Sequence, residues 1–329
     1  MDITTLKTTV SALLASTKGI LAADESSGTI KKRFEKIGLA SDPDTNLAYR
    51  KMLFTTPGIE QHLSGIILFD ETIRQEIDGV SVPEYLESKG ILPGIKVDKG
   101  AVDLPNFPDE KIIEGLDGLK ARLEEYVGMG AKFTKWRAVI KIGEKTPTNT
   151  CLFANGEVLA RYASLAQQAN LVPIIEPEVI RDGAHDLAKC AQVTAQTLKA
   201  VFEMIKEYKV ALEGLILKTN MATSGEDNPN QVSSQEVAKA TIDVLLQSVP
   251  KELPGIVFLS GGQSSEYATE NLNEINKIGG PWELSFSFAR ALQDEAMKTW
   301  AGKDENVESA QKAFSDRAQK VSFARQGKL

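Results

Sequence analysis

Histidine and cysteine are scarce in this chain, with two residues of each among 329. The cysteines, Cys151 and Cys190, are too few for a disulfide framework, and their spacing matches neither a zinc ribbon nor a redox pair. No metal-ligand spacing surrounds His62 or His185, which excludes a zinc enzyme built on three imidazoles. We therefore expect a protein without a metal site.

An excess of positive charge and long apolar runs are also lacking. The 38 lysine and arginine residues face 45 aspartate and glutamate residues, and the net charge of −7 argues against a general nucleic-acid binder. No run approaches the ~20 apolar residues that cross a bilayer, and the N-terminus lacks the basic and apolar regions of a signal peptide. We expect a soluble cytoplasmic protein that binds neither nucleic acid nor membrane. A local basic pocket for a small anion remains compatible with this composition.

The chain does contain a short apolar run that recurs eight times, followed in each case by a turn and a segment of helical period. The runs are Gly19–Ala23, Gly65–Phe69, Gly94–Val97, Trp136–Ile142, Leu171–Glu176, Gly214–Lys218, Gly255–Ser260 and Leu284–Phe288. Most are nearly continuous rather than alternating, which is typical of strands buried on both faces. This pattern predicts an α/β protein with a closed (β/α)8 TIM barrel, and an open doubly wound sheet is the alternative.

The segments between and after these runs have helical patterns. Ser233 and Glu236 form an S-x-x-E capping box that predicts the start of a helix. The segment after Arg290 is helical throughout, so we place C-terminal helices against the outside of the barrel. We expect one barrel domain over residues 1–329.

Charged and small polar residues gather at the predicted strand ends, which is where barrels carry their functional groups. They are Asp24, Lys96, Lys135, Arg137, Lys141, Glu176, Glu178, Lys218, Ser260, Gly261, Gly262, Ser287 and Arg290. Burying so many charges costs free energy unless they pair or face a common ligand. The pattern therefore predicts a polar cavity at one end of the barrel.

Lys218 directly follows the apolar run Leu215–Leu217. A buried lysine close to other cations holds its proton less tightly, and a neutral amine attacks a ketone to form a Schiff base. The protonated imine then accepts the electrons of a breaking carbon–carbon bond. The alternative is that Lys218 pairs with Glu176 or Glu178 for stability alone.

Glu176 and Glu178 are two residues apart, so an extended strand points both to the same side. Pro177 between them favours extension and predicts that the strand ends here. Two carboxylates on one face repel, and one of them then holds a proton and suits general acid–base chemistry. The alternative, that they neutralise Lys135, Arg137 or Lys218, is compatible with this role.

Two groups of residues have the composition of anion-binding sites. Ser260, Gly261 and Gly262 offer bare backbone N–H groups and a hydroxyl next to a loop that carries Ser287 and Arg290. Ser26, Thr29, Lys32 and Arg33 follow the first strand near a predicted helix start, and the alternative there is a solvated helix end. Two phosphate-compatible sites on either side of a lysine predict a substrate phosphorylated at both ends.

These residues resemble the class I (Schiff-base) fructose-bisphosphate aldolases of animals and plants. The matching stretches run in the family's order and cover nearly the whole chain: GILAADESSGTIKKRF, GIKVDKG, GLDGL, KWRAVIKIGE, ARYASL, PIIEPE, HDL, LEGLILKTNM, FLSGGQS, NLNEIN, LSFS and RALQ. The resemblance implies a TIM barrel that reversibly cleaves fructose 1,6-bisphosphate into dihydroxyacetone phosphate and glyceraldehyde 3-phosphate, in glycolysis and gluconeogenesis. It further implies an enzyme without metal or cofactor, and a homo-oligomer, in this family a tetramer.

The resemblance also implies roles for the catalytic residues. Lys218 matches the Schiff-base lysine, and Glu176 matches the glutamate that serves carbinolamine formation and dehydration. Glu178 matches the neighbouring carboxylate. Asp24 matches the aspartate near the C4 hydroxyl, and Lys135 the lysine that supports proton transfer and contacts substrate.

The remaining matches concern substrate binding. Arg137 matches the arginine beside the lysine that Lys135 matches, and Lys96 matches the lysine of the GIKVDKG stretch. Two sets match the phosphate pockets: Ser260, Gly261 and Arg290 in one, and Ser26, Thr29, Lys32 and Arg33 in the other. By position alone, Gly262 and Ser287 join the first set.

Four departures from the family accompany the resemblance. Thr219 stands where a proline is frequent, and Ala289 where many members have glycine. The stretch 44–50, which ends in Arg50, lacks the paired arginines of the animal enzymes, so a basic substrate contact is expected to be missing. The chain ends in ARQGKL, without the C-terminal tail whose tyrosine enters the active site in typical members.

Two other functions remain open from the sequence. One is a different Schiff-base barrel lyase or transferase, similar to a transaldolase, that acts on a singly phosphorylated sugar. The other is a catalytically idle scaffold that binds partners through the same fold. The two predicted phosphate groups favour the bisphosphate enzyme over both.

Overall fold

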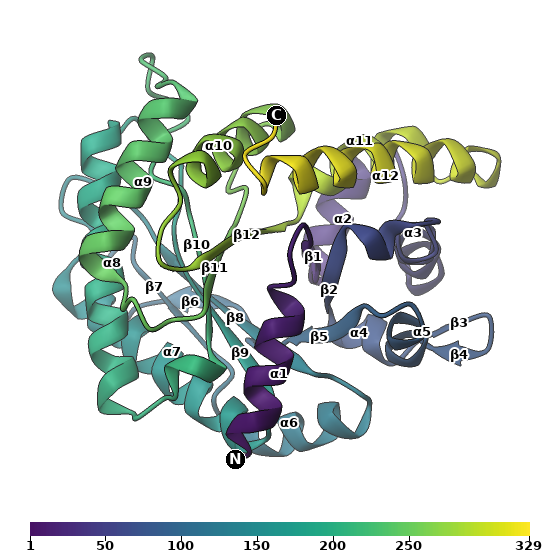
Figure 1. Cartoon of the computed structure of the whole chain (residues 1–329), viewed down its shortest axis with the longest axis horizontal. Helices are drawn as coiled ribbons and strands as arrows, with labels where there is room; N and C mark the ends of the chain where they lie inside the picture. Colours follow the sequence, from purple (N-terminus) through teal and green to yellow (C-terminus); the bar gives the residue numbers. More distant parts are fainter.

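A computed structural model describes all residues, 1–329, and contains a closed eight-stranded parallel barrel (Figure 1). The neighbouring strands around the barrel run in the order β1, β12, β11, β10, β9, β8, β5 and β2. Their bounds are β1 Gly19–Ala23, β2 Leu63–Leu68, β5 Leu92–Lys96, β8 Phe133–Ile140, β9 Val172–Val179, β10 Ile216–Thr219, β11 Gly255–Phe258 and β12 Glu283–Phe288. Each of the eight predicted runs contributes one strand, so the predicted TIM barrel is confirmed and the open sheet is not formed.

Helices surround this barrel, and two short antiparallel hairpins extend from it. The hairpins are β3 (Glu76–Ile77) with β4 (Val80–Ser81), and β6 (Ala101–Asp103) with β7 (Lys111–Ile113). The first six helices are α1 Ile3–Leu13, α2 Ser27–Glu35, α3 Pro43–Phe54, α4 Asp70–Ile73, α5 Val82–Ser88 and α6 Leu119–Gly128. The other six are α7 Asn149–Gln168, α8 Leu187–Glu207, α9 Ser234–Ser248, α10 Ser265–Ile278, α11 Arg290–Trp300 and α12 Val307–Ala324. The predicted capping box of Ser233 and Glu236 is present at the start of α9.

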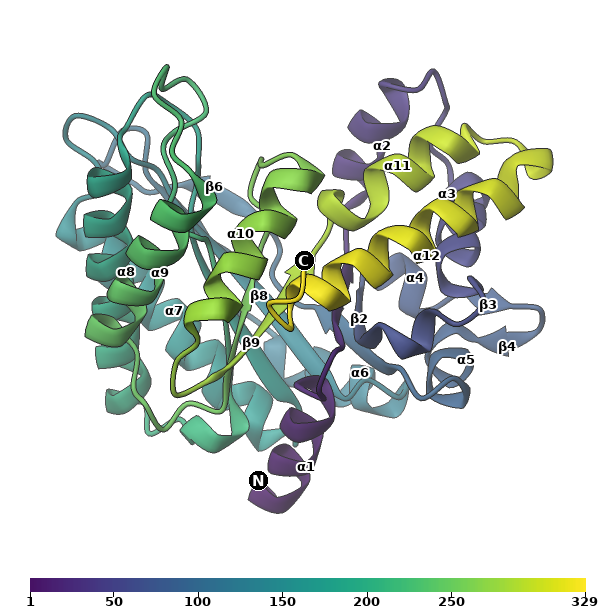
Figure 2. The ribbon, with the colours of Figure 1, turned by 45° about the horizontal axis from the view of Figure 1, so that its top comes forward.

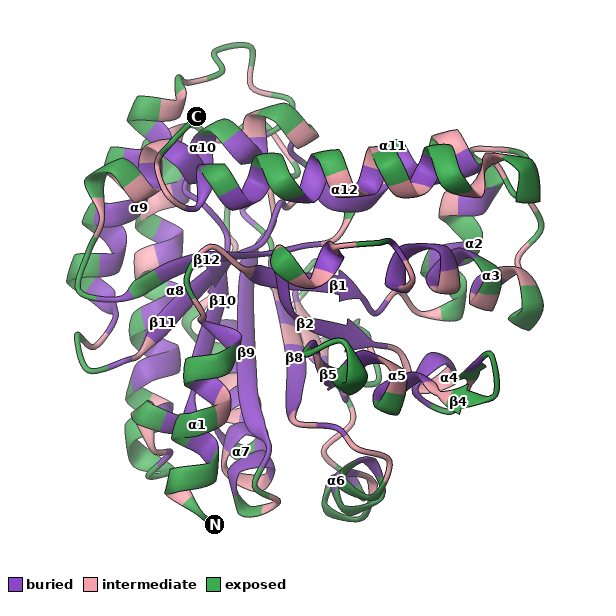
Figure 3. Cartoon of the chain, turned by 45° about the vertical axis from the view of Figure 1, so that its right-hand side comes forward, coloured by how far each residue is buried: buried purple, intermediate pink, exposed green.

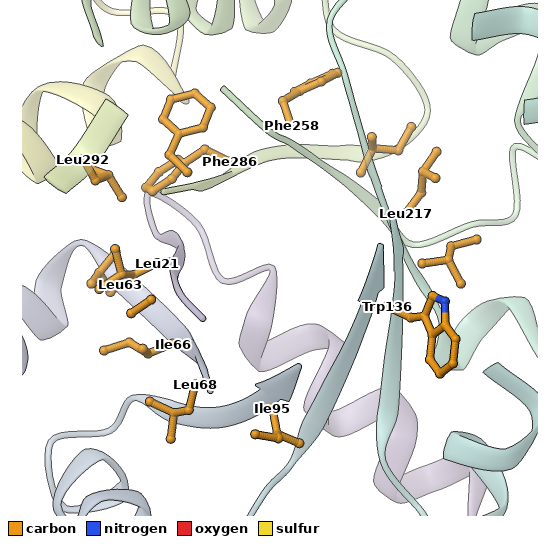
Figure 4. Packing of buried hydrophobic residues seen from close by; sticks show 14 of the residues in the cluster. Leu21, Leu63, Ile66, Leu68, Ile95, Trp136, Leu217, Phe258, Phe286 and Leu292 are labelled. Atoms are coloured by element: carbon orange, nitrogen blue, oxygen red, sulfur yellow. The ribbon is translucent and has the colours of Figure 1, made fainter. Parts of the chain in front are cut away.

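The main hydrophobic core lies between the barrel and its helices. Its 68 buried residues come from the outward faces of the strands and the inward faces of the helices. The barrel strands are buried along most of their length, whereas the helices alternate between buried and exposed positions (Figure 3). Figure 4 shows this packing around Leu68, Ile95, Trp136 and Phe286. Burial on both faces explains why the strand sequences are continuous apolar runs.

The N-terminal helix α1 covers one end of the barrel. A second core of 12 buried residues joins Leu6, Val10 and Leu13 of α1 to interior side chains of the strands, including Ile174 and Ile216. Because side chains alternate along a strand, the interior residue two positions after Ile174 is Glu176, and two positions after Ile216 is Lys218. The barrel interior is therefore apolar at the end covered by α1 and charged toward the carboxyl ends of the strands.

The C-terminal helices α11 and α12 lie side by side on the outside of the barrel (Figures 1 and 2). The apolar positions Leu292, Ala296, Trp300 and Phe314 are buried, and α12 also packs against α3 and α10. The predicted placement of these helices is therefore confirmed. None of the twelve helices combines the length and the apolar character that a membrane span requires.

Pro177 does not end its strand, contrary to our expectation. β9 continues through Glu178 to Val179 and stays paired with β8 along this stretch, where Pro177 lies opposite Ala138. Pairing with β10 stops at Ile175, so the last part of β9 has a neighbour on one side only. A residue without a backbone N–H is tolerated in a strand with one unpaired side.

Candidate active site

A cavity of about 460 Å³ opens at the carboxyl ends of the barrel strands. Of the residues predicted at the strand ends and in the two anion-binding groups, only Gly262 and Lys141 do not line it; those that do are Asp24, Ser26, Thr29, Lys32, Arg33, Lys96, Lys135, Arg137, Glu176, Glu178, Lys218, Ser260, Gly261, Ser287 and Arg290. Glu25, Lys36 and Asp98 also line it and were not predicted. The predicted cavity therefore exists, and it brings together residues from seven of the eight barrel strands or the segments that follow them.

A chain of four buried charges forms the floor of this cavity. The Nζ atom of Lys218 lies 3.0 Å from Oε1 of Glu176, and the other oxygen of that carboxylate lies 3.2 Å from Nζ of Lys135. Lys135 also contacts Oδ2 of Asp24 at 2.5 Å. All four side chains are at most about one-tenth exposed. Two cations and two anions therefore neutralise one another in a place where an unpaired charge would be costly.

This arrangement keeps the carboxylates ionised. Burial on its own would raise the pKa of Asp24, but the positive charges of Lys135 and Lys218 outweigh it and hold that pKa below its ordinary value. The pKa of Glu176 is lowered in the same way, against burial, by Lys135, Lys218 and Arg137. Burial would lower the pKa of Lys135, but Asp24 and Glu176 raise it. Glu176 is thus available as a base beside the Lys218 amine, while Lys135 stays a cation.

A second group of charges lies along the wall formed by β5, β8 and β9. Nε of Arg137 donates to Oε2 of Glu178 at 2.5 Å, and the Glu178 charge raises the pKa of Arg137. Lys96 lies 2.6 Å from Oδ1 of Asp98, whose other oxygen accepts the backbone N–H of Arg137 at 3.2 Å. Sequence reasoning missed Asp98 because it follows the strand end by two residues. The only signal was its place inside the GIKVDKG stretch.

The loops after β11 and β12 form a pocket rich in backbone N–H groups. Gly261 and Gly262 both have positive φ, 41° and 80°, a conformation that side chains rarely adopt. A Cβ on Gly261 would lie 2.6 Å from Leu259 Cδ1, so that side chain would have to move. The buried hydroxyl of Ser287 has no hydrogen-bond partner within the chain, which is consistent with a hydroxyl that binds a ligand. Arg290, the first residue of α11, is exposed at this pocket.

The residues after β1 divide into two sets. Ser26 and Thr29 face each other with their hydroxyl oxygens 3.1 Å apart at the start of α2, and Lys32 is exposed. Arg33 instead pairs with Glu25 and with Asp294, the latter at 3.0 Å. Its guanidinium is therefore already held by protein groups, and in this structure it forms part of the cavity wall.

No group of three or more histidine, cysteine, aspartate or glutamate side chains is placed to hold a metal ion. The chemistry that the arrangement offers is that of an amine, a neighbouring base, a fixed cation and two groups of residues with the composition of anion-binding sites. This set suits a Schiff base with a phosphorylated carbonyl compound.

Comparison with known proteins identifies the family. The family model described as "Glycolytic: Fructose-bisphosphate aldolase class-I" matches residues 5–329. The chain is 51% identical over 332 residues to a protein named "Probable fructose-bisphosphate aldolase class 1" from Xanthomonas axonopodis pv. citri, covering 100% of this chain and 99% of that protein. It is 51% identical over 314 residues to fructose-bisphosphate aldolase 5, cytosolic, of Arabidopsis thaliana, covering 94% and 87%. The chain belongs to the class I fructose-bisphosphate aldolases.

A solved structure agrees with this assignment. The fructose-bisphosphate aldolase of Plasmodium falciparum, crystallised with TRAP and a small-molecule inhibitor, superposes with a TM-score of 0.97 at 46% identity over 99% of this chain and 95% of that one. The function expected from the sequence, a class I aldehyde-lyase of glycolysis acting on a sugar phosphate, is confirmed. The transaldolase-like alternative does not fit this family.

Two departures of this aldolase from the wider family have a structural explanation. Ala289 replaces a frequent glycine just before α11, and its φ of −102° lies outside the left-handed region that favours glycine. The stretch 44–50 forms part of α3, and its one arginine, Arg50, is buried at 1% exposure instead of lining the cavity. Thr219 is also buried, and nothing in the structure explains why it replaces proline.

Proposed function

We propose that this aldolase reversibly cleaves fructose 1,6-bisphosphate into dihydroxyacetone phosphate and glyceraldehyde 3-phosphate, with Lys218 as the Schiff-base residue. The observation that carries the proposal is the 3.0 Å contact between Nζ of Lys218 and Oε1 of Glu176, on the floor of a cavity with a phosphate-compatible pocket on each side. A lysine with a carboxylate base in reach and apolar strand residues behind it has what a nucleophilic amine needs.

The first steps build the imine. Glu176, kept ionised by Lys135 and Lys218, accepts a proton from the Lys218 ammonium, and the neutral amine attacks the C2 carbonyl. The same carboxyl group then protonates the C2 hydroxyl, which leaves as water and yields a protonated imine. Glu178 holds Arg137 at 2.5 Å beside this carboxyl, so we assign it a positioning role.

Cleavage follows at the C3–C4 bond. Asp24 takes the proton of the C4 hydroxyl, the C4 oxygen becomes the aldehyde oxygen, and the C3–C4 electrons move into the imine to give an enamine. Lys135 contacts both Asp24 and Glu176 and stabilises the negative charge on either carboxylate. The enamine takes a proton from water at C3, Asp24 returns the C4 hydroxyl proton to solvent, and hydrolysis of the imine releases dihydroxyacetone phosphate and restores the Lys218 amine.

Two pockets orient the substrate in this proposal. Ser260, Gly261, Gly262, Ser287 and Arg290 bind one phosphate through N–H groups, hydroxyls and a guanidinium. Ser26, Thr29 and Lys32 bind the other at the start of α2, while Arg33 supports that wall through Glu25 and Asp294. Lys96 and Arg137 add positive charge between the two pockets.

We further propose a cytoplasmic homo-oligomer that serves glycolysis and gluconeogenesis. The Arabidopsis relative is named cytosolic, and both cysteines of this chain are free and buried. The proposed homo-oligomer follows from the family resemblance, which implies a tetramer. Light scattering coupled to size-exclusion chromatography measures the assembly, and a monomeric mass would contradict it.

Borohydride trapping tests the mechanism directly. The enzyme is incubated with fructose 1,6-bisphosphate or dihydroxyacetone phosphate, reduced with borohydride, digested and mapped by mass spectrometry. Labelling at Lys218, with loss of activity in proportion to the label, supports the proposal. Labelling at Lys135 or Lys96 would assign the nucleophile to another strand. No labelling and no cleavage would favour an idle scaffold.

A further inference from the structure

Arg50 is a buried arginine outside the cavity. It lies on α3 and is 1% exposed. Its Nε atom donates to the carbonyl oxygen of Ala23 at 3.3 Å, and its Nη2 atom donates to the carbonyl oxygen of Glu25 at 3.0 Å. These carbonyls lie on either side of Asp24, the first residue after β1.

The backbone at Asp24 makes no strand pairing within the barrel. Pairing of β1 with β2 ends at Ala23, opposite Leu68, and pairing with β12 ends at Leu21. Asp24 nevertheless has to keep its carboxylate 2.5 Å from Lys135 inside the cavity. The two hydrogen bonds from Arg50 replace the missing pairing, because a planar guanidinium holds two acceptors in one fixed geometry.

Stability alone does not account for this arginine. A buried guanidinium costs free energy unless it is well paired, and buried ion pairs are often no more stabilising than apolar side chains of similar volume. The pairing of Arg50 is loose: Nη2 lies 4.0 Å from Glu25, and Nη1 lies 3.7 Å from Glu71 and makes no hydrogen bond. Its best contacts are those to the two carbonyls that flank Asp24.

We propose that Arg50 is a positioning residue that acts through Asp24 on cleavage of the C3–C4 bond. The inference rests on the proposed function, in which Asp24 accepts the proton of the C4 hydroxyl. Dihydroxyacetone phosphate has no C4. Imine and enamine formation with this compound therefore needs Lys218 and Glu176 but not a correctly placed Asp24. Loss of the Arg50 contacts slows cleavage and leaves the reaction with dihydroxyacetone phosphate intact.

Arg50→Lys is the main variant, because it keeps the positive charge and loses the two-carbonyl geometry. Arg50→Met removes the charge at similar length. We expect kcat for fructose 1,6-bisphosphate cleavage to fall by ten- to about a hundredfold, the scale of a small misplacement of a catalytic group, with KM within about threefold of wild type. Exchange of a hydroxymethyl hydrogen of dihydroxyacetone phosphate with solvent deuterium, and borohydride labelling at Lys218, should stay within about threefold.

Arg325→Lys is the matched control. Arg325 is also buried, and its guanidinium donates to the carbonyls of Leu14, Ala15 and Lys18, in the segment that leads into the opposite end of β1. Arg325 therefore contacts the chain next to the same strand, but at the end that is far from the cavity. We expect this variant to lower the melting temperature and to leave kcat and the hydrogen exchange unchanged.

Combination with Asp24→Asn tests the route of the effect. If Arg50 acts through Asp24, the Arg50→Lys/Asp24→Asn double variant cleaves as slowly as Asp24→Asn alone, within about twofold, instead of showing the product of the two effects. Multiplicative effects would overturn the proposal, as would an equal loss of cleavage and hydrogen exchange, or an unchanged kcat in Arg50→Lys. Failure of both Arg50 variants to fold would make the residue structural and also overturn it. Absence of labelling and exchange in the wild type would contradict the proposed function instead.

Discussion

The ammonium group of Lys218 lies 3.0 Å from Oε1 of Glu176. Both side chains point into the barrel two residues after an apolar interior residue of their strand, so their separation is set by strand register and not by a mobile loop. Groups held on strands keep their geometry better than groups on loops. The fold therefore fixes the distance across which Lys218 and Glu176 exchange a proton.

Lys218→Arg should abolish cleavage while preserving substrate binding. Arginine keeps the positive charge next to Glu176, but its guanidinium does not form an imine with a ketone. We expect kcat to fall by several orders of magnitude and the affinity for fructose 1,6-bisphosphate to change by less than roughly tenfold, since both phosphate pockets are untouched. A coupled assay of triose phosphate formation and calorimetric titration measure the two effects.

The exposed Lys141 provides the control for this variant. It follows β8 and lies outside the cavity lining, so Lys141→Arg should cleave at the wild-type rate and label normally with borohydride. Residual borohydride labelling in Lys218→Arg would show that another lysine is the nucleophile.

Arg290→Ala should weaken the binding of both fructose 1,6-bisphosphate and dihydroxyacetone phosphate. Loss of a hydrogen-bonded guanidinium from a phosphate costs about 1.5–3 kcal/mol, or roughly ten- to a hundredfold in affinity. Arg161→Ala is the control, because Arg161 pairs with Glu157 on the exposed face of α7, away from the cavity. Unchanged affinity for both compounds would place this phosphate elsewhere.

Activity should not respond to strong chelators. The chain has two histidines, and its Schiff-base chemistry places the electron sink on Lys218 rather than on a metal ion. Dialysis against EDTA followed by the cleavage assay checks this expectation, with addition of zinc as the second arm. Activity that disappears with EDTA and returns with zinc would contradict the Schiff-base mechanism.

The barrel and the position of its polar end were predictable because both depend on local pattern. Each strand is a nearly continuous apolar run, and in most of them a charged or small polar residue such as Lys218, Glu176 or Ser287 stands at the same end. Residues two apart share a face of a strand, so the inward direction of these side chains follows from strand periodicity. The phosphate loop of Gly261 was equally visible, since adjacent glycines after a strand indicate positive φ.

The residues that hold the site in place were not predictable from local pattern. Asp98 binds Lys96 and the backbone of Arg137, and Arg50 binds the backbone on both sides of Asp24, although they come from separate elements. Arg33 was predicted to contact phosphate because it lies near a helix start, and its pairing with Asp294 depends on α11, 261 residues later in the chain. Contacts between residues this far apart in the chain, such as that of Arg33 with Asp294, have no signature in the sequence around either residue.

Asp24→Asn should make the free energy of unfolding depend less on pH in the acid range. The folded-state pKa of Asp24 is lowered from its ordinary value of 3.8, because the charges of Lys135 and Lys218 outweigh burial. A lowered pKa means that the unfolded chain binds the proton more tightly, so the carboxylate stabilises the fold above pH 3.8 and this contribution is lost as the pH falls further. Removal of the carboxylate removes that dependence.

Urea unfolding at a series of pH values between about 5 and 3, the range in which an aspartate titrates, measures this effect. We expect the wild type to lose more free energy of unfolding than Asp24→Asn over this range, with the two curves converging at the acid end. Glu176 keeps a lowered pKa in both proteins, so some acid sensitivity remains in the variant. Asp316→Asn, at an exposed pair with Lys312, should match the wild-type profile. Parallel curves for wild type and Asp24→Asn would show that Lys135 and Lys218 do not stabilise the Asp24 carboxylate in the folded state.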